Sequence, residues 1–153
     1  KAGGSTFASY VSTLPQRSGD EYHALWWTKA EADQLLGTYA HSELLTLMEE
    51  VDEVSVRLRS GALRQDVGLF GATAVDEAVR AAYVSILSRA FGDNLTRAKQ
   101  AMIPLLDMMQ HGAVATASYA YEDDETVVVA RAVGAHPAGE ELVISSGSHP
   151  DFV

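Results

Sequence analysis

The chain has 153 residues, of which 47% are hydrophobic, and its 11 basic and 21 acidic residues give a formal net charge of −10. These values are typical of one globular domain with a buried core, and they exclude a disordered chain. The negative charge repels phosphate backbones and anionic lipids, which excludes nucleic acid as an expected partner. A basic peptide or protein surface would be attracted, although solubility alone accounts for most of this charge.

The composition also limits the chemistry that is available to the chain. Cysteine is absent, which excludes disulfides, thiolate metal sites and a cysteine nucleophile. The histidines lack metal-ligand spacing, and the acidic run over residues 122–125 lacks the spacing of a calcium loop. We therefore expect no metal cofactor. No run of about 18 apolar residues occurs, so we expect no membrane span.

The first predicted region, residues 1–27, is an irregular N-terminal segment. It ends with Trp26 and Trp27, which directly precede the first strong helix signal. Large aromatic side chains contribute much of the buried area of a core. We therefore interpret the two tryptophans as buried anchors for that helix rather than as a cage for a ligand.

Residues 28–91 are predicted to form a helical region. Thr28 is followed three residues later by Glu31, which is the pattern of a capping box. This pattern predicts a helix over residues 29–36 that ends near Gly37, because glycine favours the conformation that closes a helix.

Two longer helices are predicted within this region, over residues 40–59 and from residue 73 to residue 89 or 91. The first has an apolar stripe made of Leu44, Leu47, Met48, Val51, Val54 and Leu58. Glu49, Glu50, Asp52 and Glu53 lie largely off that stripe, on a face that we interpret as solvated. Three glycines predict a loop over residues 61–72, between the two helices.

The pattern changes from helical to β in residues 92–153, the third predicted region. Residues 103–109 are apolar and indicate a helical turn or a buried extended segment. Residues 114–121 and 126–130 flank a polar turn and predict a hairpin. Residues 141–145 predict a third strand. Helices followed by a small antiparallel sheet indicate the α+β class.

Three short motifs carry further information. They read Ser-Arg-Ala-Phe over residues 88–91, Pro-Leu-Leu-Asp-Met-Met-Gln-His-Gly over residues 104–112 and Gly-Glu-Glu-Leu-Val-Ile-Ser-Ser-Gly over residues 139–147. Together they resemble the SET-domain protein methyltransferases, in the branch typified by the Rubisco large-subunit lysine methyltransferase. The corresponding family motifs are Ser-Arg-aromatic, Pro-hydrophobic-hydrophobic-Asp-x-x-Asn-His-Ser and Gly-Glu-x-hydrophobic-x-Ile-x-Tyr-Gly.

The resemblance implies a partial SET-like fold. Residues 28–91 would correspond to the helical insertion of that family, and residues 92–153 to the C-terminal half of its SET domain. The opening strands that hold part of the cofactor and the helical lobe that grips the substrate would lie outside this chain. In the family, the Asn-His segment lies close to the segment with the tyrosine, and together they line the pocket for S-adenosylmethionine.

The resemblance implies three cofactor-binding residues. Arg89 belongs to a polar pair near the cofactor and the peptide cleft. Gln110 stands where the family has the asparagine that binds the amino-acid end of S-adenosylmethionine, and its side chain is longer by about one methylene. His111 matches the histidine whose backbone contacts the adenine.

Three other residues are implied in the substrate cleft and at the catalytic position. Ser88 and Asp107 match cleft positions, although Asp107 also has the alternative of capping a helical turn or pairing with Arg89. Ser146 stands where the family has the tyrosine that closes the methyl-transfer channel. Serine keeps a hydroxyl but loses the reach and the aromatic wall, so the resemblance implies a defective site.

We therefore expect a degenerate SET-domain protein that acts as a non-catalytic binding, accessory or structural subunit together with other protein subunits. The alternative is a fragment of an active methyltransferase that uses S-adenosylmethionine to modify protein lysine or histidine. In that case Tyr119 or Tyr121 would supply the missing tyrosine. Since the family is rich in plastid proteins, the resemblance implies an intracellular location, with the plastid as one compartment.

Overall fold

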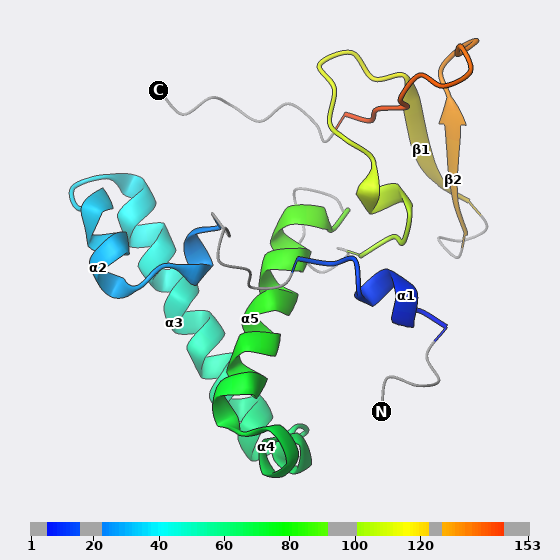
Figure 1. Ribbon diagram of the computed structural model, residues 1–153. Coiled ribbons are helices and arrows are strands. Elements are labelled where there is room, and N and C mark those ends of the chain that lie inside the picture. The colour runs from blue at the N-terminus through cyan, green and yellow to red at the C-terminus, as the bar shows by residue number, and fades with distance from the viewer. Residues whose placement is uncertain (1–5, 16–22, 92–100, 123–126, 146–153) are drawn as a thin grey trace. The chain divides into compact units, whose positions relative to one another are not determined.

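The computed structural model describes residues 6–15, 23–91, 101–122 and 127–145. The chain divides into two compact units, Lys1–Ser88 and Arg89–Val153. Helices form the first unit, and the second contains a two-stranded antiparallel sheet (Figure 1). The predicted α+β class is therefore confirmed. Within the described ranges, no helix has both the length and the hydropathy that crossing a membrane requires.

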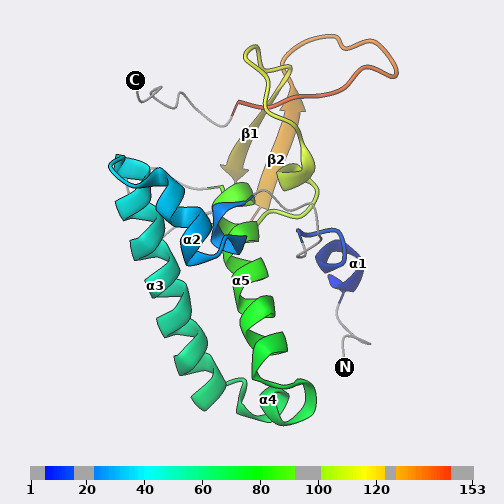
Figure 2. The ribbon, with the colours of Figure 1, turned by 60° about the vertical axis from the view of Figure 1, so that its left-hand side comes forward.

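Two long helices, α3 and α5, dominate the first unit. They are joined through α4 and run side by side in both views (Figures 1 and 2). In chain order the elements are α1 (Ala8–Val11), the 3-10 turn η1 (Ala24–Trp26), α2 (Lys29–Ala32), the 3-10 turn η2 (Asp33–Leu35), α3 (Tyr39–Ser60), α4 (Arg64–Phe70) and α5 (Ala72–Arg89). The two predicted long helices are confirmed.

The short helix that the capping box predicts is present as α2 followed by η2. The Thr28 side chain accepts from the Glu31 backbone amide, and the Glu31 carboxylate accepts from the Thr28 amide at 2.6 Å. These reciprocal bonds satisfy amides that the first turn of a helix leaves without partners. Gly37 has a φ of 90° and follows the 3-10 turn, so the glycine ends the helix as predicted.

The predicted loop over residues 61–72 is wrong, because these residues contain α4. Gly68 lies inside this helix, and only Gly71, with a φ of 87°, ends it. A glycine inside a helix costs only about 1 kcal/mol relative to alanine, so the tertiary context can override it. Glycine content alone therefore did not distinguish this short helix from a loop.

The core of the first unit forms where η1 packs against α3 and α5. Its buried cluster consists of Leu25, Trp26, Val51, Ala81 and Val84. Leu25 and Val51 are fully buried. Trp26 is buried as predicted, whereas Trp27 is only half-buried. The apolar stripe of α3 and the tryptophan before α2 therefore meet in one cluster.

Arg80 joins the three elements around this core. From α5 its guanidinium donates to the backbone oxygen of Leu25 in η1 at 2.7 Å, and to Asp52 Oδ1 in α3 at 2.9 Å. A hydrogen bond from a charged donor to a partly buried carbonyl is among the stronger hydrogen bonds in proteins. The planar guanidinium reaches both acceptors at once, which a lysine ammonium does with difficulty.

We expect Arg80→Lys to lower the free energy of unfolding of the first unit by about 1 kcal/mol, because one of the two bonds is lost. Urea unfolding followed by tryptophan fluorescence measures this loss, since both tryptophans of the chain lie in this unit. Arg64→Lys at an exposed position of α4 is the matched control. Equal unfolding midpoints for the two variants would contradict the role of Arg80.

The second unit contains the predicted hairpin, formed by β1 (Ala117–Glu122) and β2 (Val127–Ala132). The strands are antiparallel, and Tyr119 faces Ala130 across the pair. The predicted third strand over residues 141–145 is wrong, because this segment forms only an isolated bridge. The Val143 amide donates to the Thr116 side-chain hydroxyl rather than to a backbone oxygen, which interrupts a regular ladder.

Candidate functional site

The second motif begins with a tight turn. The Phe91 and Ala101 backbones pair through bonds of 2.9 and 2.7 Å, and the 3-10 turn η4 (Leu106–Met108) follows. Between them, Leu105 has a φ of 75°, a conformation that side-chain-bearing residues rarely adopt, and its side chain is exposed. The Asp107 amide closes the turn by donating to the Ile103 oxygen at 3.0 Å. Of the two conformations considered for residues 103–109, the helical turn is confirmed.

Arg89 and Asp107 lie together in the second unit. Arg89 Nη1 donates to the backbone oxygen of Asp107 at 3.1 Å, and the Asp107 side chain is buried. The first motif therefore contacts the second through an arginine and a main-chain carbonyl. This contact positions η4 relative to the start of the unit.

The second and third motifs pair in parallel along a short stretch. The Gly112 amide donates to the Ile144 oxygen, and the Ile144 amide donates to the Gln110 oxygen, both at 3.0 Å. His111 is the bridge partner of Ile144. In a parallel bridge the amide and carbonyl of His111 itself point away from Ile144. The backbone of His111 therefore faces the opposite side, while the Gln110 and His111 side chains are exposed.

Two residues that sequence reasoning did not single out hold this pairing in place. Val143 lies between the Gln110–Gly112 stretch and Thr116, whose amide donates to the Val143 oxygen at 3.0 Å. Gly112 has no room for a side chain, since an added Cβ would lie 2.5 Å from Cγ2 of Val143. The second motif ends in His-Gly where the resembled family has His-Ser. This glycine was the one feature of the sequence that could have indicated the close approach of Gly112 to Val143.

Two predicted site residues remain, Ser88 and Ser146. Ser88 is exposed near the end of α5, in the first unit. Ser146, the implied catalytic position, lies outside the described residues, two positions after Ile144 in the sequence. The structure thus brings Arg89 to Asp107, and it brings Gln110 and His111 to the third motif.

Tyr119, one of the two tyrosines considered as a substitute, packs edge-on against Phe91 with ring centroids 5.0 Å apart. Burial, and to a smaller extent Tyr121, raises the pKa of Tyr119 above its usual value. Its hydroxyl is therefore protonated at neutral pH. Tyr121 lies on the same strand and is more exposed.

No group of three or more His, Asp or Glu side chains that could hold a metal ion occurs in the described part of the chain.

Comparison with known proteins supports the methyltransferase resemblance. A protein of Arabidopsis thaliana named [fructose-bisphosphate aldolase]-lysine N-methyltransferase, chloroplastic, is 30% identical to this chain over 123 residues. The chain is similar to a lysine N-methyltransferase. The match covers 77% of this chain but only 24% of that relative, so the chain spans about a quarter of its length. No family model matches the chain, and no solved structure matches it.

Proposed function

We propose that this chain is part of a SET-type methyltransferase relative whose transfer site is degenerate, and that it acts as a binding or accessory subunit. The observation that carries the proposal is the parallel pairing of Gln110–Gly112 with Val143–Ile144. It joins the two segments that line the cofactor pocket in the resembled family. This pairing supports a site whose frame is retained around altered residues.

The retained frame suits part of S-adenosylmethionine, which when bound supplies an electrophilic methyl group. The His111 backbone faces away from the pairing, as a contact with the adenine would require. Gln110 keeps the amide of an asparagine but places it about one methylene further from the backbone. Binding of the cofactor would therefore be weakened at its amino-acid end, and we expect no cofactor to remain bound to the isolated protein.

The altered residue at 146 supports the non-catalytic part of the proposal. Methyl transfer needs an amine aligned with the methyl group, and small misplacements cost large factors in rate. A serine hydroxyl ends several bonds short of a tyrosine hydroxyl. Ser146 would therefore leave the channel open and the amine unaligned.

The alternative function is an active protein-lysine or protein-histidine methyltransferase that includes this chain. The similarity to a protein named as a lysine N-methyltransferase favours it. The chloroplastic name of that relative favours a plastid location under either proposal. The net charge of −10 favours a basic protein as partner or substrate.

Native mass spectrometry of the protein isolated from its source distinguishes the two functions. The non-catalytic proposal predicts complexes with other subunits and no added mass of S-adenosylmethionine or its demethylated product. Transfer of methyl groups to a protein at an ordinary enzymatic rate, about 1 per second or faster, would overturn it.

If the altered residues at positions 110 and 146 alone prevent methyl transfer, replacing them with the family residues should restore it. We expect Gln110→Asn combined with Ser146→Tyr to raise methyl transfer at least about tenfold, because the cofactor amide and the channel hydroxyl regain their reach. Radiolabel transfer from S-adenosylmethionine to basic proteins measures the gain. Ser145→Tyr with Gln110→Asn is the matched control, because it adds the same tyrosine at the neighbouring position and leaves Ser146 unchanged.

Wild-type transfer as fast as that of the restored variant would contradict the proposal and support the active enzyme. Equal gains in the restored variant and the Ser145→Tyr control would show that position 146 is not the catalytic position.

A further inference from the structure

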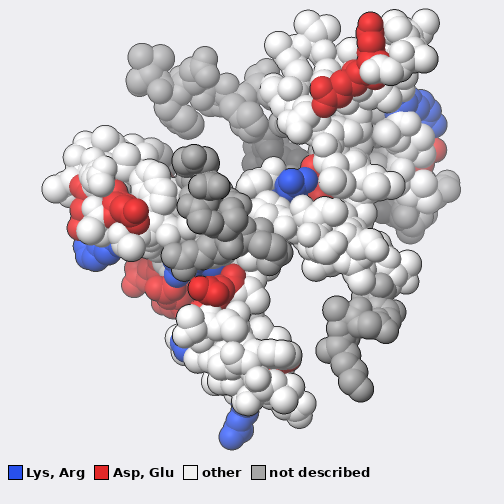
Figure 3. Space-filling model, viewed as in Figure 1, with Lys and Arg blue, Asp and Glu red and all other residues white. Residues whose placement is uncertain are grey.

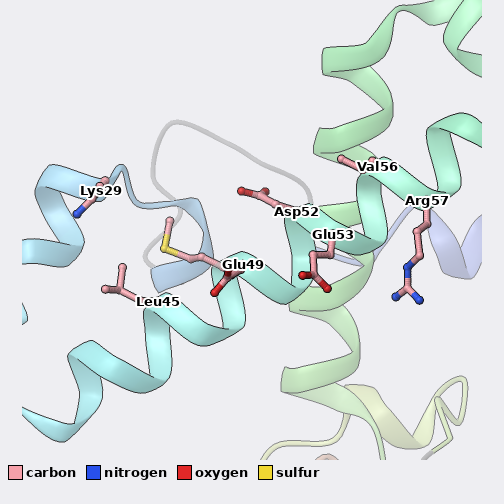
Figure 4. Close-up of a pocket in the computed structure, with 8 residues that line it drawn as sticks. Lys29, Leu45, Glu49, Asp52, Glu53, Val56 and Arg57 are labelled. Carbon is pink, nitrogen blue, oxygen red and sulfur yellow. The ribbon is translucent and has the colours of Figure 1, made fainter.

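A groove of about 720 Å³ runs along α3 in the first unit (Figure 4). We call it the α3 groove and define it by Leu45, Met48, Val56, Glu49, Asp52 and Glu53, with Lys29 and Arg57 at its ends. Its residues on α3 recur at intervals of three and four, so they form one continuous face of the helix. Met48 also packs against the core cluster, so this face borders the buried stripe that contains Leu44 and Val51.

The surface of the α3 groove is mainly apolar, and the described residues of the first unit do not fill it. Leu45 and Met48 are half-buried, and Val56 is 54% exposed. An open apolar surface of this kind, bordered by polar residues, is typical of a binding groove. From Leu45 to Arg57 the helix rises about 18 Å, which is the length of a helical segment of about twelve residues.

The charges along the groove are mainly acidic. Figure 4 shows Glu49, Asp52 and Glu53 between Leu45 and Val56, and Figure 3 shows acidic side chains gathered in a patch on the first unit. Asp52 pairs with Arg80. Glu49 and Glu53 form no hydrogen bond or ion pair with another described residue. They stand four residues apart on one helix face, where like charges are destabilising.

We propose that the α3 groove binds a basic amphipathic helix of a partner protein. The apolar side of that helix would cover Leu45, Met48 and Val56, and its lysines or arginines would pair with Glu49 and Glu53. A second copy of this chain is a poorer occupant, because both surfaces would be acidic in a chain of net charge −10. The proposal does not depend on the candidate residues Arg89, Gln110 and His111, which belong to the second unit.

A designed peptide tests this proposal directly. It has about 14 residues, with leucines at helical spacing on one face and lysines or arginines on the other, and it carries a dye for fluorescence anisotropy. We expect binding to the purified chain that weakens at high salt. The same peptide with glutamate in place of each basic residue should not bind.

Matched charge reversals separate the groove from general attraction to an acidic protein. Glu49→Lys with Glu53→Lys should weaken binding at least about tenfold, because attraction becomes repulsion. Glu140→Lys with Glu141→Lys changes the net charge equally at exposed positions of the second unit, and it should leave most of the binding intact. Val56→Asp should also weaken binding of the basic peptide, although it makes the net charge of the chain more negative, because it removes part of the apolar contact.

Three results would overturn the proposal. Equal losses in both charge-reversal variants would mean non-specific attraction, and equal binding of the acidic peptide would mean a purely apolar contact. Sedimentation that showed a dimer abolished by Glu49→Lys with Glu53→Lys would assign the groove to a second copy. Glu49→Gln with Glu53→Gln should weaken binding less than the reversal, and circular dichroism checks that α3 remains folded.

Discussion

Leu25→Ala is expected to lower the free energy of unfolding of the first unit by about 2–5 kcal/mol. Leu25 is fully buried in the cluster with Val51 and Val84. The substitution removes three methyl or methine carbons from contact and leaves a cavity, which α3 and α5 can close only in part. Urea unfolding followed by tryptophan fluorescence measures the loss, because Trp26 belongs to the same cluster.

Leu69→Ala provides the matched control for this prediction. Leu69 lies in α4 with 75% of its surface exposed, so the same chemical change should alter the free energy of unfolding by no more than about 0.5 kcal/mol. If the two variants unfolded at the same urea concentration, η1 would not pack between α3 and α5. A native-like baseline in tryptophan fluorescence for both variants shows that the comparison is between folded proteins.

The elements with strong local signals could be predicted from the sequence. The capping box of Thr28 and Glu31 fixes the start of α2 through bonds within four residues. The apolar period of α3 extends over many turns, so its buried face follows from residue spacing alone. Where local propensity and tertiary packing agree in this way, a single sequence is sufficient.

The elements that depend on distant contacts could not be predicted in this way. α4 contains Gly68, which lowers its helix propensity, and it follows a turn in which the Leu63 amide donates to the Leu58 oxygen. Residues 141–145 have the composition of a strand, but their Val143 amide is bound by the Thr116 hydroxyl. The Thr116 hydroxyl takes the place of a backbone oxygen as the acceptor for Val143. The sequence of residues 141–145 does not reveal this replacement, because Thr116 lies far away in the chain.

In the candidate site, too, some features could be predicted from the sequence and others depend on contacts between distant segments. The motifs placed Gln110, His111 and the 139–147 segment in one family pattern, and the pairing of His111 with Ile144 joins the second motif to the third. The motif pattern did not indicate that Val143 would occupy the space beside Gly112. Shape complementarity between two segments depends on their final packing, which residue identity alone does not encode.

Gly112→Ala is expected to lower the free energy of unfolding of the second unit by about 1–3 kcal/mol through overpacking. The new Cβ would lie 2.5 Å from Cγ2 and 3.1 Å from Cβ of Val143, so one of the two segments must shift. The shift would stretch the bonds that join Gln110 and Gly112 to Ile144. Hydrogen exchange at the Ile144 amide measures the result, because this amide bonds to the Gln110 oxygen and should exchange about tenfold faster or more.

Val143→Ala should rescue much of this loss when it is combined with Gly112→Ala, since it removes the closer of the two opposing atoms. The favourable coupling between neighbouring substitutions would locate the effect in this one contact. Gly134→Ala is the matched control, because an added Cβ there meets no atom within 4 Å, and it should not speed exchange at Ile144. If the single Gly112→Ala variant left this amide fully protected, the motifs would not be packed as closely as the pairing requires. If the Ile144 amide lost its protection from exchange only when Gly112 gained a side chain, the close approach of Gly112 to Val143 would be what holds the second and third motifs together.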